Sequence, residues 1–261
     1  MKLLVLCLIG LMCGLHAATW GGFKDSPFEG FKPTSFVRSV VVGLASSIAI
    51  GIATDLESTE SVIVLIGLCY TLERLATEWW KSIVREDDQS TYSIPMRLAL
   101  RGRPIDRRCS RYAVGVAIIA GLILLCWSTQ VVQRTLSPLP LWIVLLVAGV
   151  GGWLTAVGGA WKDAPVEGFS GWKFLRSPVV ATAWAAVLSR FTGDWVILTV
   201  AAAGWSVISI ETYKTFLTGG RPPGKFADKP VRHLPHAARE ACRATHVSLY
   251  GALALTLGIG L

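Results

Sequence analysis

Charged side chains are scarce in this chain. Asp, Glu, Lys and Arg make up 16% of its 261 residues, whereas 52% are hydrophobic and eleven are Trp. Soluble domains carry roughly 25% charged residues, so this composition excludes an ordinary soluble domain and is typical of a membrane protein. The net charge of +8 comes from basic residues spaced between apolar segments. Nucleic acid is therefore not an expected partner, because no basic soluble domain is present to bind it.

Recognisable catalytic and metal-binding motifs are also missing. The six cysteines form no C-x-x-C pair and no zinc-type spacing with histidine, so neither a zinc site nor a disulfide framework is expected. The chain contains no G-x-x-x-x-G-K-[ST] loop, no G-x-S-x-G elbow and no H-E-x-x-H sequence. His233 and His236 form a His-x-x-His pair without an obvious third ligand, and we interpret them as loop histidines. Whether the protein is an enzyme stays open.

Long apolar segments are what the sequence does contain. A membrane-spanning helix needs about 20 mostly apolar residues. Eight segments approach that length, at 2–20, 37–54, 60–81, 112–133, 139–160, 176–191, 194–216 and 245–261. None of them alternates as a barrel strand does. The sequence therefore predicts an all-α polytopic membrane protein with eight transmembrane helices.

A nine-residue phrase occurs twice. Residues 23–31 read FKDSPFEGF and residues 161–169 read WKDAPVEGF, each after a long apolar segment. FVRS and FLRS then follow at the same offset, and EWWK is answered by ETYK, with Glu78 and Glu211 as their first residues. An even number of helices returns the chain to its starting side. We therefore predict two parallel, same-orientation four-helix repeats, residues 1–135 and 136–261, related by a pseudo-twofold axis along the membrane normal.

The first apolar segment has a second interpretation. Its basic start, apolar middle and small residues at Ala17 and Ala18 resemble a secretory signal peptide. The first apolar segment corresponds to the fifth, which is followed by the second copy of the phrase. If the first segment were removed, the first repeat would lack its first helix. We therefore predict that the first helix is retained.

Basic residues predict the orientation. All but three of the 25 Lys and Arg residues fall on the side where the first helix ends; the exceptions are Lys2, Arg134 and Arg190. Short cytoplasmic loops carry the Lys/Arg excess, so this side is predicted to be cytoplasmic, with both termini outside an inner or plasma membrane. The acidic residues Asp55, Glu57, Glu60 and Asp194 fall outside. Anionic lipid headgroups are expected partners at the cytoplasmic face. A membrane-protein partner or a second copy of the chain stays open.

Charged residues of both copies define the candidate substrate site. The repeated phrases and the two E-x-x-K turns emerge on the basic side, where the glycine-rich loop 217–232 adds further cations. The predicted set is Lys24, Asp25, Glu29, Arg38, Glu78, Lys81, Lys162, Asp163, Glu167, Arg176, Glu211, Lys214, Arg221 and Lys225. These residues are expected to form two clusters, one in each repeat. The carboxylates of Asp25 and Glu29, and of Asp163 and Glu167, are candidates to hold Mg²⁺ beside a phosphate.

The repeated phrase also fits a purely structural role. Ser26 could cap a short helix that has Pro27 first and ends at Gly30. In the second copy Asp163 would have to act as the cap, and Gly168 would end the helix. The arginine-rich loop at 97–111 needs no ligand either, because orientation and lipid attraction account for it.

Three functions follow from these features. A transporter or channel for an anionic or phosphate-bearing substrate is favoured by the basic face, which concentrates anions, and by the short second and sixth helices, which are rich in small residues and expected to lie centrally. The scarcity of ionisable residues within the helices argues against a transporter. Only Glu73 is expected near the middle of a helix, and its equivalent in the second repeat is Ser206. The alternatives are a non-catalytic subunit or scaffold of a membrane complex, and an enzyme acting on a phosphorylated lipid, such as a prenyl diphosphate, with a divalent cation.

Overall fold

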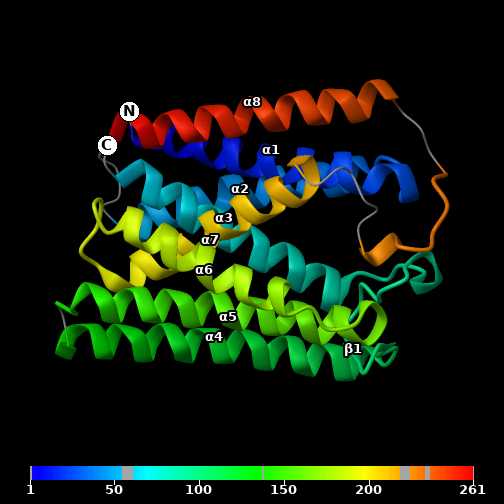
Figure 1. Ribbon diagram of the computed structural model, residues 1–261, viewed down its shortest axis with the longest axis horizontal. Coiled ribbons are helices and arrows are strands. Elements are labelled where there is room, and N and C mark those ends of the chain that lie inside the picture. Colours follow the sequence, from blue (N-terminus) through cyan, green and yellow to red (C-terminus); the bar gives the residue numbers. More distant parts are fainter. Residues whose placement is uncertain (1, 55–60, 137, 218–223, 233–235, 261) are drawn as a thin grey trace.

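Eight α-helices make up most of the protein (Figure 1). The computed structural model describes residues 2–54, 61–136, 138–217, 224–232 and 236–260. The helices are α1 (Lys2–Glu29), α2 (Pro33–Ala53), α3 (Val62–Trp79), α4 (Arg108–Leu136), α5 (Leu141–Glu167), α6 (Gly171–Leu188), α7 (Trp195–Thr212) and α8 (His236–Gly260). The other described elements are short: two π-helices, η2 (Trp80–Val84) and η4 (Tyr213–Leu217), two 3₁₀ turns, η3 (Gln89–Thr91) and η5 (Gly224–Phe226), and a hairpin of β1 (Ala99–Leu100) with β2 (Arg103–Pro104). The predicted all-α class is confirmed.

Five helices are long and apolar enough to cross a membrane. They are α1, α2, α4, α5 and the continuous run of α7 with η4. Among the described residues, α3, α6 and α8 fall short of this measure. In α4 only Arg111 and Gly115 are buried, and large side chains such as Leu124 and Trp127 are exposed. So large an exposed apolar surface is unstable in water but is at home in lipid, consistent with a membrane protein.

The centre of the bundle is the contact between α3 and α7. α1 and α2 pack on one side of this pair, α5 and α6 on the other, and α8 covers α1 (Figure 1). Glycines allow the close central approach, since a Cβ on Gly67 would lie 2.8 Å from the Trp205 ring and one on Gly204 would lie 2.7 Å from the hydroxyl of Thr71. The prediction that the second and sixth helices lie centrally is therefore wrong. Their small residues instead pack against α1 and α5.

Glycine also forms the contacts α1–α2 and α5–α6. A Cβ on Gly14 would lie 2.7 Å from the Cα of Val40, and one on Gly152 would lie 2.7 Å from the carbonyl oxygen of Ser177. Small residues of this kind let helix backbones approach within a membrane, where van der Waals packing replaces the hydrophobic effect between helices.

The repeated phrase extends α1 and α5 and starts no new helix. Pro27 and Pro165 lie inside the last turns of these helices, and the backbone N–H groups of Gly30 and Gly168 donate to carbonyl oxygens four residues earlier, at 2.9 and 3.0 Å. The predicted helix starts at Ser26 and Asp163 are therefore wrong. Each proline lacks the N–H that would bond the carbonyl four residues earlier, and the apolar helix before it nevertheless continues for two further residues. The glycines do end the helices, with φ of 74° and 80°, as predicted.

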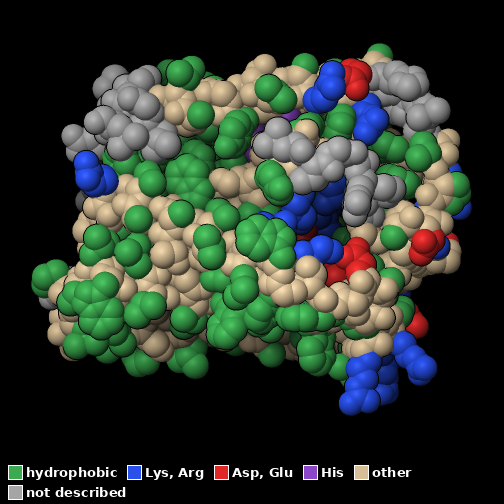
Figure 2. Space-filling view, in the orientation of Figure 1, with side chains coloured by type: hydrophobic (Ala, Val, Ile, Leu, Met, Phe, Trp, Pro, Cys, Tyr) green, Lys and Arg blue, Asp and Glu red, His purple; other side chains and the backbone are tan. Residues whose placement is uncertain are grey.

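The eight α-helices run roughly between two opposite ends of the molecule (Figure 1). α1 ends toward the right of Figure 1, the side on which the β1 hairpin lies, and η2, α5 and η4 also end toward that side, which we call the basic end. Lys and Arg side chains gather there, whereas the opposite half is largely hydrophobic (Figure 2). At that opposite end Asp194 caps α7, accepting from the N–H groups of Val196 and Ile197 at 2.9 Å. Asp55, Glu57 and Glu60 lie outside the described residues.

Candidate functional site

Ten ionisable side chains gather inside the bundle toward the basic end. They come from α1, α2, α3, α7 and the segments η2, η4 and η5, and act on one another electrostatically. This inner cluster comprises Lys24, Asp25, Arg38, Glu73, Arg74, Glu78, Lys81, Glu211, Lys214 and Lys225. Its members come from both predicted repeats. The structure thus joins in one place residues that the sequence assigns to two clusters.

The ion pair between Asp25 and Lys225 connects the start of the chain to its end. Lys225 Nζ lies 2.7 Å from Asp25 Oδ2, and the two side chains are only 12% and 20% exposed. Next to it, the ring of Phe226 stacks on Phe28 with centroids 4.6 Å apart. The N–H of Arg232 donates to the carbonyl oxygen of Pro27 at 2.9 Å. The segment 224–232 is therefore held over the end of α1.

A buried ion pair lies deeper, midway along α3 and η2. Glu73 is fully buried; its Oε1 accepts from the hydroxyl of Thr77 at 2.8 Å, and its Oε2 lies 3.2 Å from Nε of Arg74. Arg74 also lies 3.7 Å from Glu78. Ionised groups at such depth in an apolar bundle are costly and mark substrate or proton paths in membrane proteins.

Positive charge exceeds negative charge in the inner cluster. The two E-x-x-K turns each form their own pair, Lys81 with Glu78 at 2.9 Å and Lys214 with Glu211 at 3.0 Å. Lys24 lies over the Trp20 ring at 3.9 Å and, in the part of the chain that the structure describes, pairs with no carboxylate within 4 Å. The six basic and four acidic members leave an excess of two positive charges. An anion of about two charges would neutralise this excess.

The predicted residues on α5 and α6 border the inner cluster. Lys162 acts electrostatically on Glu78, and Asp163 is within range of Lys162 and Lys214. Glu167 pairs with Lys173 at 2.8 Å. Arg176 has a buried Nε without a hydrogen-bond partner, as does Arg38.

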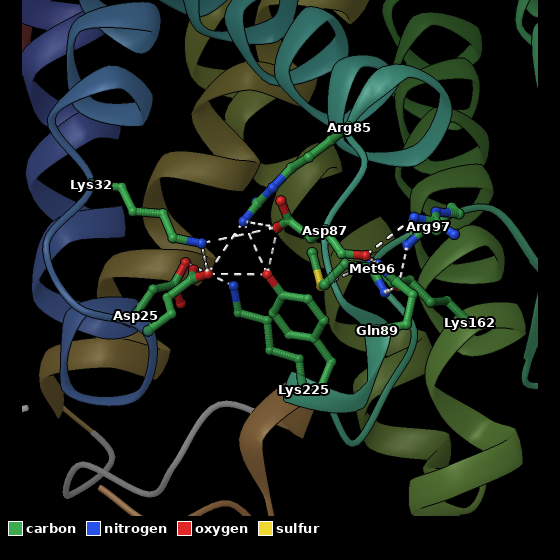
Figure 3. Close-up of polar contacts among 11 residues, drawn as sticks. Asp25, Lys32, Arg85, Asp87, Gln89, Met96, Arg97, Lys162 and Lys225 are labelled. Carbon is green, nitrogen blue, oxygen red and sulfur yellow. Dashed lines mark hydrogen bonds and ion pairs between the residues drawn. The ribbon is translucent and has the colours of Figure 1, made fainter. Parts of the chain in front are cut away.

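Glu29 belongs to a second group, the outer network of Glu29, Lys32, Arg85, Asp87 and Tyr92 (Figure 3). Glu29 Oε2 lies 2.5 Å from Lys32 Nζ, 3.2 Å from an Arg85 nitrogen and 3.0 Å from the Tyr92 hydroxyl. Arg85 also pairs with Asp87, whose Oδ2 lies 2.8 Å from the same hydroxyl. Arg85, Asp87 and Tyr92 were not predicted. Their one sequence signal is the charged stretch that follows the first E-x-x-K turn.

Hydrogen bonding sets the protonation of the outer network. Burial disfavours the charged carboxylate of Asp87, but hydrogen bonds from Arg85 and Tyr92 outweigh it and hold the pKa of Asp87 below its ordinary value. Burial and the negative charge of Glu29 raise the pKa of the Tyr92 phenol well above its ordinary value. The network is therefore most stable with Asp87 ionised and Tyr92 neutral.

Replacing Tyr92 by Phe is expected to reduce the loss of stability at alkaline pH. A raised pKa in the folded state contributes stability below the unfolded value of about 10, and this contribution is lost as the pH rises above it. In detergent at pH 8, Tyr92→Phe should lower the free energy of unfolding by about 1–2 kcal/mol, because hydrogen bonds are lost. Its melting temperature should therefore be below that of the unaltered protein. Between pH 8 and pH 11 its melting temperature should fall less steeply. The exposed Tyr112, changed to Phe, is the matched control, and equal slopes for all three proteins would contradict the assignment.

Two histidines that the sequence did not single out lie where α1 and α8 meet. His16 and His246 are both at most 1% exposed, and their ring centroids lie 3.8 Å apart. Each is the one histidine of an otherwise mainly apolar stretch. A lone ionisable residue within a membrane segment is itself a signal of function.

The candidate magnesium ligands are not assembled into a metal site. Asp25, Glu29 and Glu167 each pair with a lysine, and among the described residues no three His, Cys, Asp or Glu side chains form a group that could hold a metal ion. The described residues therefore show no divalent-cation site. Arg221 and His233 lie outside the described residues, as does the side chain of His236.

The arrangement suits binding of an anion, because the six cations of the inner cluster outnumber its four carboxylates. No protein-family profile, curated protein or solved structure matches the chain. The function therefore has to be argued from these residues alone.

Proposed function

We propose that the chain is a membrane transporter for a small phosphate-bearing anion, with the inner cluster as its binding site. The observation that carries this proposal is the excess of two positive charges in the inner cluster, whose members are mostly buried or half-buried, Glu78 and Lys214 being exposed. Lys24, which has no carboxylate within 4 Å among the described residues, is the natural contact for a phosphate oxygen. Lys81 and Arg74 lie within electrostatic range of the same charges. Charge-assisted hydrogen bonds of this kind are among the strong ones available to a protein.

The proposed architecture is eight spanning helices in two parallel four-helix repeats. Three correspondences support it: η2 and η4 are π-helical at an offset of 133 residues, and the helix-ending Gly30 and Gly168 and the contact glycines Gly14 and Gly152 are offset by 138. By the Lys/Arg excess, the basic end is proposed to face the cytoplasm, with both termini outside. The contact of α3 with α7 would then be the surface on which the repeats move.

The depth of the charges favours transport over a purely structural role. From the sequence, Glu73 was the one ionisable residue expected mid-helix, and Arg74 now joins it in a buried pair. Beyond this pair, away from the basic end, the bundle is filled by apolar side chains such as Leu65, Leu198 and Trp205. Charged groups toward one end and apolar packing toward the other are compatible with one state of an alternating-access cycle.

Binding and exchange of inorganic phosphate test the proposal. The purified protein should be stabilised against heat by phosphate or pyrophosphate, relative to chloride at equal ionic strength, because a ligand stabilises the state that binds it. Reconstituted into liposomes loaded with phosphate, it should exchange external [³²P]phosphate faster than empty liposomes do.

A matched pair of variants locates the site. Lys24→Gln should weaken phosphate binding about tenfold or more, because one charge-assisted contact is lost. Arg190→Gln, an exposed change at the opposite end, should leave binding unaltered. Absence of both stabilisation and exchange in the unaltered protein would refute the proposed function, and equal effects of the two variants would move the site elsewhere.

A further inference from the structure

The two buried histidines lie deeper in the bundle than the inner cluster, near Tyr70, one helical turn before Glu73 and Arg74. His16 is about 20 Å along α1 from Glu29, taking 1.5 Å per residue, which puts it near the middle of the helix. His246 faces it from α8. On the far side of the pair lie the apolar residues of the sealed half, among them Leu6 and Leu253. The pair therefore lies between the inner cluster and the apolar half of the bundle.

Hydrogen bonding leaves one nitrogen of the pair open. Nδ1 of His246 lies 3.2 Å from the carbonyl oxygen of His16, which can only accept, so this nitrogen carries the hydrogen. Nε2 of His246 is then free to accept from the hydroxyl of Thr212 at 3.2 Å. Nδ1 of His16 lies 3.3 Å from the Tyr70 hydroxyl, whereas Nε2 of His16 is buried and finds no hydrogen-bond partner among the described residues. A buried, unpartnered imidazole nitrogen is a position from which a proton can be gained or lost.

Charge in the inner cluster acts on the pair. Tyr70 and Arg74 from α3 and Tyr250 from α8 contact or act on the pair directly. Glu73, Glu211 and Cys13 act electrostatically on Tyr70 in turn. Arg74, next to Glu73 and Glu78, repels a proton on His16, and two imidazoles at 3.8 Å do not both carry a charge. A bound anion would neutralise the excess positive charge of the inner cluster and remove part of that repulsion.

We infer that the His16–His246 pair binds one proton that is carried together with the anion, so that the transporter is a proton–anion symporter. This inference rests on the proposed function. Because an anion and a proton that attract one another across the site bind cooperatively, each raises the affinity for the other by the same factor. Co-transport of the proton also reduces the net charge that crosses the low-dielectric interior.

Exchange and accumulation separate the two claims. In liposomes holding equal phosphate inside and outside at one pH, exchange of [³²P]phosphate tests the proposed function without needing net proton movement. In liposomes with a pH gradient, acid outside, the unaltered protein should accumulate [³²P]phosphate at least tenfold faster than without the gradient. Phosphate exchange with no response to the gradient would overturn symport and leave the transporter standing, whereas absent exchange would sink the transporter itself.

Variants assign the proton to the pair. At saturating phosphate, where a weakened affinity no longer limits exchange, His16→Asn and His246→Asn should still exchange [³²P]phosphate and should lose the response to the pH gradient. Retained exchange shows that the variant is folded. If either variant fails to fold, proton uptake by the unaltered protein decides the matter: a pH-sensitive dye inside the liposomes should record one proton entering for each phosphate, and ¹⁵N-histidine NMR should show an imidazole becoming protonated when phosphate is added at constant pH. A full gradient response in both folded variants, or no phosphate-dependent protonation of histidine, would overturn the inference.

Discussion

Replacing Asp25 by Ala is expected to lower the free energy of unfolding by about 3 kcal/mol, because removal of one partner of a buried ion pair leaves the other charge uncompensated. Lys225 would then lie 12% exposed beside Lys24 and Lys81, with three cations in mutual range. The segment 224–232 should also be released from the end of α1. Unfolding in mixed micelles measures the first effect, and limited proteolysis within 224–232 measures the second.

Two further variants isolate the cause. The double change Asp25→Ala with Lys225→Met should recover more than half of the lost stability, since neither charge is then left alone. The exposed pair Glu240–Arg243 on α8, 49% and 57% exposed, is the matched control, and Glu240→Ala should have no measurable effect. If Asp25→Ala were as stable as the unaltered protein, Lys225 would not lie on Asp25.

Replacing Gly152 by Ala is expected to destabilise the protein by about 2–3 kcal/mol, the upper part of the range for overpacking a well-packed contact. The new Cβ would lie 2.7 Å from the backbone oxygen of Ser177 and 2.9 Å from the Cα of Pro178, and backbone atoms cannot turn away as a side chain does. α5 and α6 would therefore have to move apart. Gly14→Ala should behave alike, because its Cβ would meet the backbone of α2 at Val40.

The neighbouring glycine is the control for this effect. A Cβ on Gly151 would meet nothing within 4 Å, so Gly151→Ala should be neutral or stabilising by up to roughly 1 kcal/mol, the helix propensity gained. Thermal unfolding in detergent compares the two variants directly. Equal melting temperatures for Gly151→Ala and Gly152→Ala would mean that α5 and α6 do not touch at Gly152.

Local patterns in the sequence predicted what depends on the chain near each residue. The apolar segments gave the order of the helices, and Gly30 and Gly168 end their helices because only a residue without a Cβ readily takes φ near +77°. The E-x-x-K turns pair within themselves, as residues three apart on a helix do. The helix starts at Ser26 and Asp163 were predicted wrongly, because the capping pattern is local whereas the apolar helix before it was already formed.

Contacts between distant segments were beyond the sequence pattern. Asp25 and Lys225 are 200 residues apart, and nothing in either segment indicates the other. The same holds for His16 and His246, whose meeting depends on how α8 packs against α1. The sequence also could not identify the helices at the centre of the bundle. Small residues favour close packing, but they do not indicate which helix will pack against them.

The attachment of α4 gives this helix a role in matching the protein to its bilayer. Near one end Arg111 is buried on Glu86, and near the other Gln133 Nε2 lies 2.5 Å from Asp194, while the apolar stretch between them is largely exposed. Twenty-two residues of helix separate these two polar anchors by about 33 Å, close to the roughly 30 Å of hydrocarbon in a typical bilayer. In a thinner membrane, part of the apolar surface of α4 would be exposed to water. In a thicker membrane, one of the two polar anchors would lie within the hydrocarbon. α4 cannot tilt far without breaking one of its two anchors. The distance between the anchors therefore sets the bilayer thickness in which the bundle is most stable.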